Sequence, residues 1–353
     1  MQIRIRYHII EKKLDKGSKK FMKNSTITSV AERAGVSVAT VSRVLTGKGT
    51  VSKSTKQRVL QAAQQLNYRD GTLPSSVRRQ KSGLVLVLVP RLANAFYTSI
   101  IDGIQCVLRE YDYKLMLGQT LADSIKTRSY LNYLLNGMVD GIIMMDYTID
   151  QTMLKGTEEI RQRIVQCCEM NAEVECSYVT IDDIAASTQA VNYLISTGRK
   201  RIALMNSSMK FKYARGRLQG YRDALESAGI PVDQALITNV PDIDFNVAYS
   251  SADQLLELPD RPDAVFCVSD TYAAAVIKCA TRKGLSIPAD LAVVGFDNTD
   301  IASMIEPAIT TVHQPRYQMG ELSCRLLMNQ IENEDAPVVK QVLKTELIVR
   351  DST

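Results

Sequence analysis

From Gly83 onward, short apolar runs alternate with longer segments of helical periodicity. Runs that are apolar throughout are typical of parallel strands buried on both faces. Alternation of such strands with helices produces a doubly wound sheet, and about twelve strands are too many for one sheet. We therefore expect an α/β body of two doubly wound parallel-sheet lobes. The clearest apolar runs are Leu84–Val89, Gly141–Met145, Arg201–Met205, Ala264–Val268 and Leu291–Phe296.

The charge of the chain is divided unevenly between its two parts. Residues 1–82 contain 18 Lys/Arg and four Asp/Glu, a net charge of +14. The other 271 residues contain 25 Lys/Arg and 34 Asp/Glu, a net charge of −9. A basic part joined to an acidic part predicts a polyanionic partner for the basic part alone. A solvated basic tail is the alternative.

The segment that follows the basic N-terminal arm predicts three short helices. Thr28 or Ser29 is expected to cap the first helix. Gly35 permits a left-handed turn, and Ser37 is a good cap for a second helix over Val38–Leu45. Three short helices with a tight glycine turn between the first two describe a helix-turn-helix unit, although a simple packed bundle has a similar pattern.

The second of these helices has the composition of a DNA recognition helix. Its N-terminus can enter a major groove, where Val38 and Ala39 would meet the bases. Arg43 lies one turn beyond Ala39 on the same face, and arginine suits bidentate contact with guanine. Hydroxyl groups near the helix N-terminus can bind phosphates, namely those of Ser37, Thr40 and Ser42.

These patterns predict four segments. The first is either a basic arm or a stretch ahead of a true start at Met22. A helix-turn-helix head and a polar, basic hinge follow, and the last segment is the two-lobed body, in which we expect the chain to cross between lobes near residues 182, 312 and 340. The predicted bounds are 1–24, 25–70, 71–82 and 83–353.

The head closely resembles that of the lactose/galactose repressor (LacI/GalR) family. The family signature V-S-x-A-T-V-S-R-V-L is matched by Val36–Leu45, and V-S-x-x-T-x-x-R-V by Val51–Val59. The resemblance extends over roughly residues 26–353, with phrases typical of the cytidine-repressor branch at 217–221 and 314–320. It implies a homodimeric repressor of transcription. Its partners would be a pseudo-palindromic operator in double-stranded DNA and a small-molecule effector, a sugar or a nucleoside.

The hinge departs from the family pattern. There, A-R-S-L places a leucine that wedges into the minor groove, and the matching residues here are 74–77, reading P-S-S-V. Val77 therefore takes the wedge position, and Arg78 follows it as a phosphate ligand. Because valine reaches less far than leucine, we expect a short hinge helix from near Thr72 that kinks DNA less.

The effector site is expected between the lobes, at the carboxyl ends of the strands. The resemblance implies that Arg217 and Asp297 hold polar groups of the ligand and that Phe96 and Tyr97 pack on it. An aromatic residue that stacks on the ligand in relatives aligns near Ile243, and Phe245 is the expected substitute. Cys168 stands where relatives often carry a polar residue.

The sequence offers little for catalysis. Its two histidines, His8 and His313, allow no histidine metal cluster and only one candidate triad, so we expect no enzyme activity, no metal and no cofactor.

The start of the chain has no apolar signal core, and seven cysteines without a C-x-x-C pair suit a reduced cytoplasm without membrane attachment. Two alternatives remain: a small-molecule binding protein without DNA function, and a sugar-modifying α/β enzyme.

Overall fold

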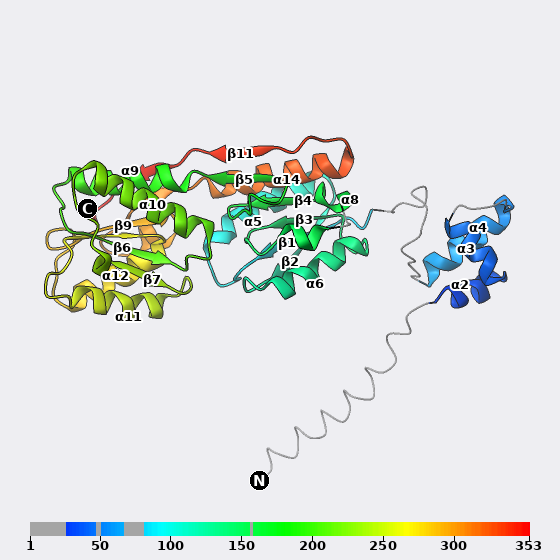
Figure 1. Cartoon of the computed structure of the whole chain (residues 1–353), viewed down its shortest axis with the longest axis horizontal. Helices are drawn as coiled ribbons and strands as arrows, with labels where there is room; N and C mark the ends of the chain where they lie inside the picture. The colour runs from blue at the N-terminus through cyan, green and yellow to red at the C-terminus, as the bar shows by residue number, and fades with distance from the viewer. Residues whose placement is uncertain (1–25, 47–50, 67–80, 156–157) are drawn as a thin grey trace, which may run out of the picture. The chain divides into compact units, whose positions relative to one another are not determined.

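A computed structural model of the chain describes residues 26–46, 51–66, 81–155 and 158–353. The chain divides into two compact units, a head within residues 1–80 and a body of residues 81–353 (Figure 1). The expected N-terminal arm, the hinge helix, Val77 and Arg78 lie outside the described residues. Within the described segments, no helix combines the length and the apolar character needed to cross a membrane.

The described part of the head is formed by three short helices, as the sequence predicts. They are α2 (Ile27–Ala34), α3 (Val38–Thr46) and α4 (Lys53–Gln65). Valines and alanines form most of their shared core, in which Val30, Val41, Val59 and Leu45 are fully buried. Helical spacing directs these residues inward and leaves the opposite faces of the helices to solvent.

The first cap differs from the prediction. Helix α2 begins at Ile27, one residue before Thr28, so Thr28 and Ser29 lie inside its first turn. Thr26 is the N-cap: its Oγ1 accepts the Ser29 N–H at 3.3 Å, and the Ser29 hydroxyl accepts the Thr26 N–H at 3.4 Å. Gly35 ends the helix in the left-handed region, at φ 64°. Ser37 caps α3 as expected, accepting the Thr40 N–H at 3.2 Å.

The body contains two six-stranded sheets, which confirms the predicted fold class. The sheet of the N-lobe is parallel throughout and has the order β11-β5-β4-β3-β1-β2. Its strands are β1 (Leu84–Val89), β2 (Lys114–Gln119), β3 (Gly141–Met144), β4 (Ile164–Cys167), β5 (Ser177–Ile181) and β11 (Lys340–Leu343).

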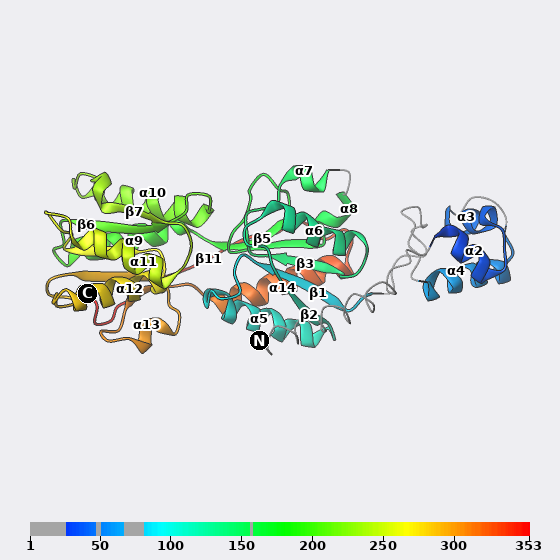
Figure 2. The ribbon, with the colours of Figure 1, turned by 90° about the horizontal axis from the view of Figure 1, so that it is seen from below.

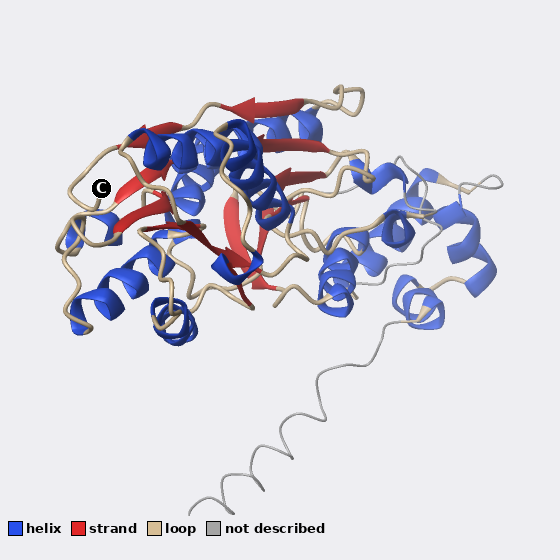
Figure 3. Cartoon of the chain, turned by 60° about the vertical axis from the view of Figure 1, so that its left-hand side comes forward, coloured by secondary structure: helices blue, strands red, loops and turns tan. Residues whose placement is uncertain are grey.

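The sheet of the C-lobe has the order β12-β10-β9-β8-β6-β7, in which β12 alone is antiparallel to its neighbour. Its strands are β6 (Ile202–Ser207), β7 (Ile237–Val240), β8 (Ala264–Cys267), β9 (Ala292–Asp297), β10 (Thr310–His313) and β12 (Glu346–Ile348). Helices, blue in Figure 3, lie on both sides of the sheets, whose strands are red.

The interior strand β1, next to the edge strand β2, shows why both faces of the N-lobe sheet are covered. Val85, Val87 and Val89 belong to one apolar cluster, and Leu86 and Leu88 to another. Side chains alternate across a strand, so each face needs its own helical layer. The valines meet α5 (Phe96–Glu110) and α14 (Arg316–Glu332), which pack together (Figure 2). The leucines meet α6 (Ser124–Leu135), near the short helices α7 (Gln151–Leu154) and α8 (Glu158–Arg161).

The C-lobe is covered by two helix pairs (Figure 1). Helix α9 packs on α10, and α11 packs on α12, while the four-residue α13 follows β9 and the 3-10 turn η3 (Gln234–Leu236) precedes β7. Large side chains such as Tyr221 and Tyr272 are fully buried. The bounds are α9 (Asp183–Ser196), α10 (Lys212–Ser227), α11 (Phe245–Leu256), α12 (Asp270–Arg282) and α13 (Ile301–Met304).

The chain passes between the lobes three times, each time from the carboxyl end of a strand. Asp182 joins β5 to α9, Gln314 and Pro315 join β10 to α14, and residues 344–345 join β11 to β12. The carboxyl ends of both sheets therefore face each other. In open α/β sheets, ligands bind outside this edge.

Candidate functional site

Helix α3 presents a face of small and polar side chains to solvent. Val38, Ala39 and Arg43 are exposed. The opposite face is held in the head, because Val41, Val44 and Leu45 are buried against α2 and α4. Of the predicted phosphate-binding residues, Ser37 is exposed and bonded to Thr40, and Thr40 and Ser42 are half-buried. The six residues that the sequence assigns to DNA binding within the described head thus lie together along α3 and its N-cap.

A cleft lies between the carboxyl ends of the two sheets. The space within it is about 660 Å³, and part of this space is open to solvent. All four predicted effector-binding residues line it: Phe96 and Tyr97 from the N-lobe, Arg217 and Asp297 from the C-lobe. The other side chains that line it are those of Pro90, Arg91, Asn94, Cys168, Glu169, Ile181, Asp183, Phe211, Tyr213, Asp242, Ile243, Val268 and Gln314.

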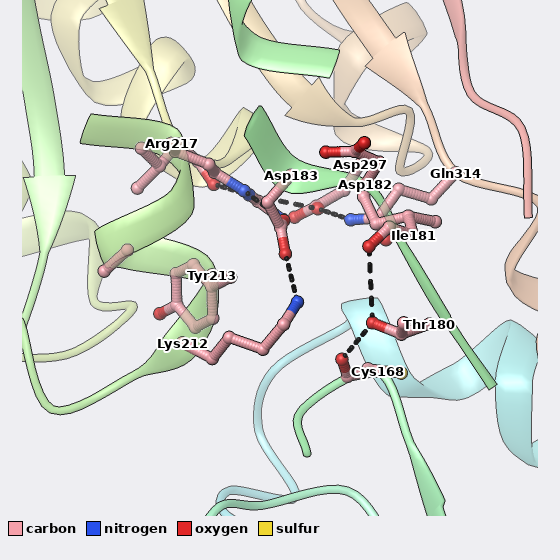
Figure 4. A network of polar contacts seen from close by, with 12 residues as sticks. Cys168, Thr180, Ile181, Asp182, Asp183, Lys212, Tyr213, Arg217, Asp297 and Gln314 are labelled. Carbon is pink, nitrogen blue, oxygen red and sulfur yellow. Dashed lines mark hydrogen bonds and ion pairs between the residues drawn. The ribbon is translucent and has the colours of Figure 1, made fainter. Parts of the chain in front are cut away.

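A buried ion-pair network forms the C-lobe wall of the cleft (Figure 4). The Nε atom of Arg217 donates to Asp183 Oδ1 at 3.1 Å, and Lys212 Nζ contacts Asp183 Oδ2 at 3.1 Å. Arg217 also donates to the Val268 carbonyl at 2.6 Å. Arg217 and Asp183 are each only 4% exposed, so this is an internal network and not a surface pair.

Asp297 is strained in its backbone and buried in its side chain. Its φ of 105° is in a region that residues other than glycine rarely adopt. Its carboxylate accepts a hydrogen bond from Gln314 Nε2 at 2.8 Å and lies 3.9 Å from Arg217 Nη1. Burial raises the pKa of Asp297 to about 7, although the nearby Arg217 acts to lower it. The carboxyl group therefore has unused capacity to accept hydrogen bonds from a ligand.

Aromatic rings cover both walls of the cleft. Phe96 and Tyr97 meet edge to face, with ring centroids 5.2 Å apart, on the N-lobe side. On the C-lobe side Phe211 and Tyr213 are stacked at 5.2 Å. The Arg217 guanidinium lies over the Tyr213 ring at 4.9 Å, which keeps the cation on an aromatic face.

The predicted aromatic substitute for Ile243 is wrong. Phe245 starts α11 and its ring lies near Tyr249 and under the ammonium group of Lys278, outside the cleft lining. Ile243 itself does line the cleft. The additional rings come instead from Phe211 and Tyr213, at the start of α10.

Sequence reasoning also missed several polar residues of the cleft. None of the following was singled out as a cleft residue: Asp183, Glu169, Gln314, Arg91 and Asp242. The signal was present, because each of these residues follows the carboxyl end of a strand within five residues. Carboxylates, an amide and a guanidinium beside aromatic rings can bind a ring compound that carries several hydroxyl groups.

Comparison with known proteins gives a consistent result for both units. Residues 26–70 match the family described as bacterial regulatory proteins, lacI family. Residues 191–353 match the periplasmic binding protein-like domain. The chain is 33% identical over 329 residues to the HTH-type transcriptional repressor CytR of Escherichia coli strain K12, covering 93% of this chain and 96% of the relative. The chain belongs to the lacI family of bacterial regulatory proteins.

Two further proteins are similar to this chain over most of its length. Catabolite control protein A of Priestia megaterium is 32% identical, with 90% of this chain and 96% of the relative covered. The solved structure of the transcriptional regulator CelR–cellobiose complex is 31% identical, covers 93% of this chain and 100% of its own, and superposes with a TM-score of 0.69. The lacI-family protein described here is accordingly a DNA-binding regulator of transcription whose body is of the small-molecule-binding type.

Proposed function

We propose that the protein is a homodimeric, cytoplasmic repressor that binds a pseudo-palindromic operator and responds to a sugar or nucleoside in its cleft. The choice of a sugar or nucleoside as the effector rests on one observation: Asp183, Arg217 and Asp297 line the cleft beside aromatic rings. Charged acceptors and donors hold hydroxyl groups, and ring faces cover the apolar side of a sugar or a base. Arg217, Asp297, Phe96 and Tyr97 are the proposed effector ligands.

In the head, we assign base contacts to Val38, Ala39 and Arg43, because these side chains are exposed along α3. Phosphate contacts are assigned to the hydroxyl groups of Ser37, Thr40 and Ser42 and, in the hinge, to Arg78, with Val77 as the minor-groove wedge. A single head covers only half of an operator, so a two-fold dimer is the arrangement that reads a pseudo-palindrome.

The test starts from operators selected by the full-length protein from random duplexes. The selected sequences are expected to be pseudo-palindromic, and sedimentation of the complex is expected to give two chains per duplex. A thermal-shift screen of sugars and nucleosides then identifies ligands that raise the melting temperature. A ligand that binds the cleft is expected to change operator affinity. Equal binding to all duplexes, or operator affinity indifferent to every ligand of both classes, contradicts the proposal.

A further inference from the structure

Helix α10 starts differently from the other long helices of the C-lobe. Helices α9, α11 and α12 begin after Asp182, Asp244 and Ser269, whose side chains accept a backbone N–H of the first turn. The N-cap residue of α10 is Phe211, whose ring cannot accept a hydrogen bond. The first N–H groups of α10 therefore need an acceptor from elsewhere in the fold.

That acceptor comes from the opposite lobe. Glu169 lies two residues beyond the end of β4, in the N-lobe, and its carboxylate reaches the start of α10. Oε2 accepts the N–H of Lys212 at 2.8 Å, and Oε1 accepts the N–H of Tyr213 at 2.8 Å. A carboxylate at this position also interacts favourably with the positive end of the helix dipole.

The burial of Glu169 makes this contact a strong link between the lobes. Glu169 is 4% exposed, so its charge depends on its two N–H donors in place of water. Burial raises the pKa of Glu169 to about 7, and the two backbone N–H donors act to lower it; of the charged groups on the C-lobe side, Asp183 raises this pKa and Lys212 lowers it. An ion pair across the cleft, Arg91 to Asp242 at 2.7 Å, is nearly half exposed on both sides and contributes little.

We propose that Glu169 is an inter-lobe latch, a positioning residue that holds the start of α10 against the N-lobe and so keeps the cleft closed. The same helix carries Tyr213 and Arg217, which line the cleft. Movement of α10 with the C-lobe would remove both N–H donors from Glu169 at once. The latch thus ties the arrangement of the lobes to the helix that forms the cleft wall, and it goes beyond the proposed function because it requires no particular effector.

Hydrogen–deuterium exchange of the full-length protein tests this inference without operator or effector. In Glu169→Ala, amides of residues 210–216 are expected to exchange several-fold faster than in the wild type. Amides of residues 90–98, on the N-lobe wall of the cleft, are expected to accelerate as well, because opening exposes both walls. Glu169→Gln keeps the shape of the side chain and one acceptor oxygen, but its NH2 group faces the second backbone N–H and cannot accept it. We therefore expect a smaller acceleration of amide exchange at both segments.

Asp244 provides a matched control, since its carboxylate accepts the N–H groups of Asn246 and Val247 within the C-lobe. Asp244→Ala is expected to accelerate exchange only around residues 245–248. If either Glu169 variant accelerates residues 210–216 while residues 90–98 exchange as in the wild type, Glu169 is merely a helix cap and the latch is overturned. If Glu169→Ala does not fold, as judged by circular dichroism, the isosteric glutamine variant decides alone. A negative result leaves the proposed regulator function intact.

Discussion

Asp297 is only 8% exposed, and this burial raises the pKa of its carboxyl group to about 7. Burial disfavours its charge, and Arg217 and Gln314 only partly offset this cost. Buried polar groups with unused hydrogen-bonding capacity are typical of binding sites that a ligand completes. At this scale, the burial and the raised pKa of Asp297 support the proposal that it binds the effector.

The raised pKa of Asp297 predicts a particular dependence of stability on pH. An acid with a higher pKa in the folded state than its ordinary value of 3.8 contributes stability below pH 4, and this is lost as the pH rises towards 7. Asp297→Asn does not ionise, so the unfolding free energy of this variant should fall less between pH 5 and 8. Urea titrations at several pH values measure it. Asp112→Asn is the control, because its carboxylate is 99% exposed. Equal slopes in wild type and Asp297→Asn contradict the assignment.

Arg43 is the residue on which base recognition by the head should depend most. It is exposed on α3, and a bidentate contact with guanine contributes about 1–3 kcal/mol. Arg43→Ala is expected to weaken operator binding by that amount and to relax the preference at one base pair. Arg33→Ala removes the same charge from α2, where Arg33 bonds Gln65 at 3.2 Å, and should keep the base preference. Binding-site selection with both variants measures this, and an unchanged preference in Arg43→Ala rules out the role.

The caps of the head helices show how local side chains stabilise an element. Thr26 and Ser29 form a reciprocal pair at the start of α2, whereas Thr28 is exposed inside the helix. Thr26→Ala is therefore expected to destabilise the head by about 1 kcal/mol. Thr28→Ala should be neutral or slightly stabilising, because alanine has the higher helix propensity. Amide exchange in α2 of the full-length variants compares the two, and the opposite order would mean that the helix starts at Thr28 or later.

The elements show what sequence patterns can predict. The strand Leu84–Val89 was predicted with its observed bounds, because an unbroken apolar run encodes it. The predictions that were wrong or missing concern contacts between residues far apart in the sequence, or helices whose first residue the sequence leaves ambiguous. Phe245 was expected as the cleft aromatic and Phe211 was not considered, since nothing local reveals which loop turns inward. The cap that Glu169 supplies to α10 joins residues 43 and 44 positions apart, and no local rule of capping connects them.

At the scale of the whole molecule, the head and the body are separate compact units. The residues assigned to DNA contact lie in one unit and the residues assigned to the effector in the other. An effector can alter DNA binding only through contacts that differ between two arrangements of the body. The three crossings between lobes are the connections through which such a rearrangement would pass. This division predicts that the two activities can be removed independently.

Asp297→Ala and Arg43→Ala should therefore show opposite losses. Asp297→Ala is expected to lose the effect of the screened effector on operator binding, while its operator affinity without effector stays within about tenfold of wild type, roughly 1.4 kcal/mol. Arg43→Ala is expected to lose operator specificity and to keep the full thermal shift with the same effector, because the cleft lies in the other unit. Titrations of each variant with operator and with effector measure its operator affinity and its response to the effector. If Asp297→Ala still responds at the effector concentrations that act on the wild type, the effector binds elsewhere. If Arg43→Ala loses effector binding, the two units are coupled more tightly than their separate cores indicate.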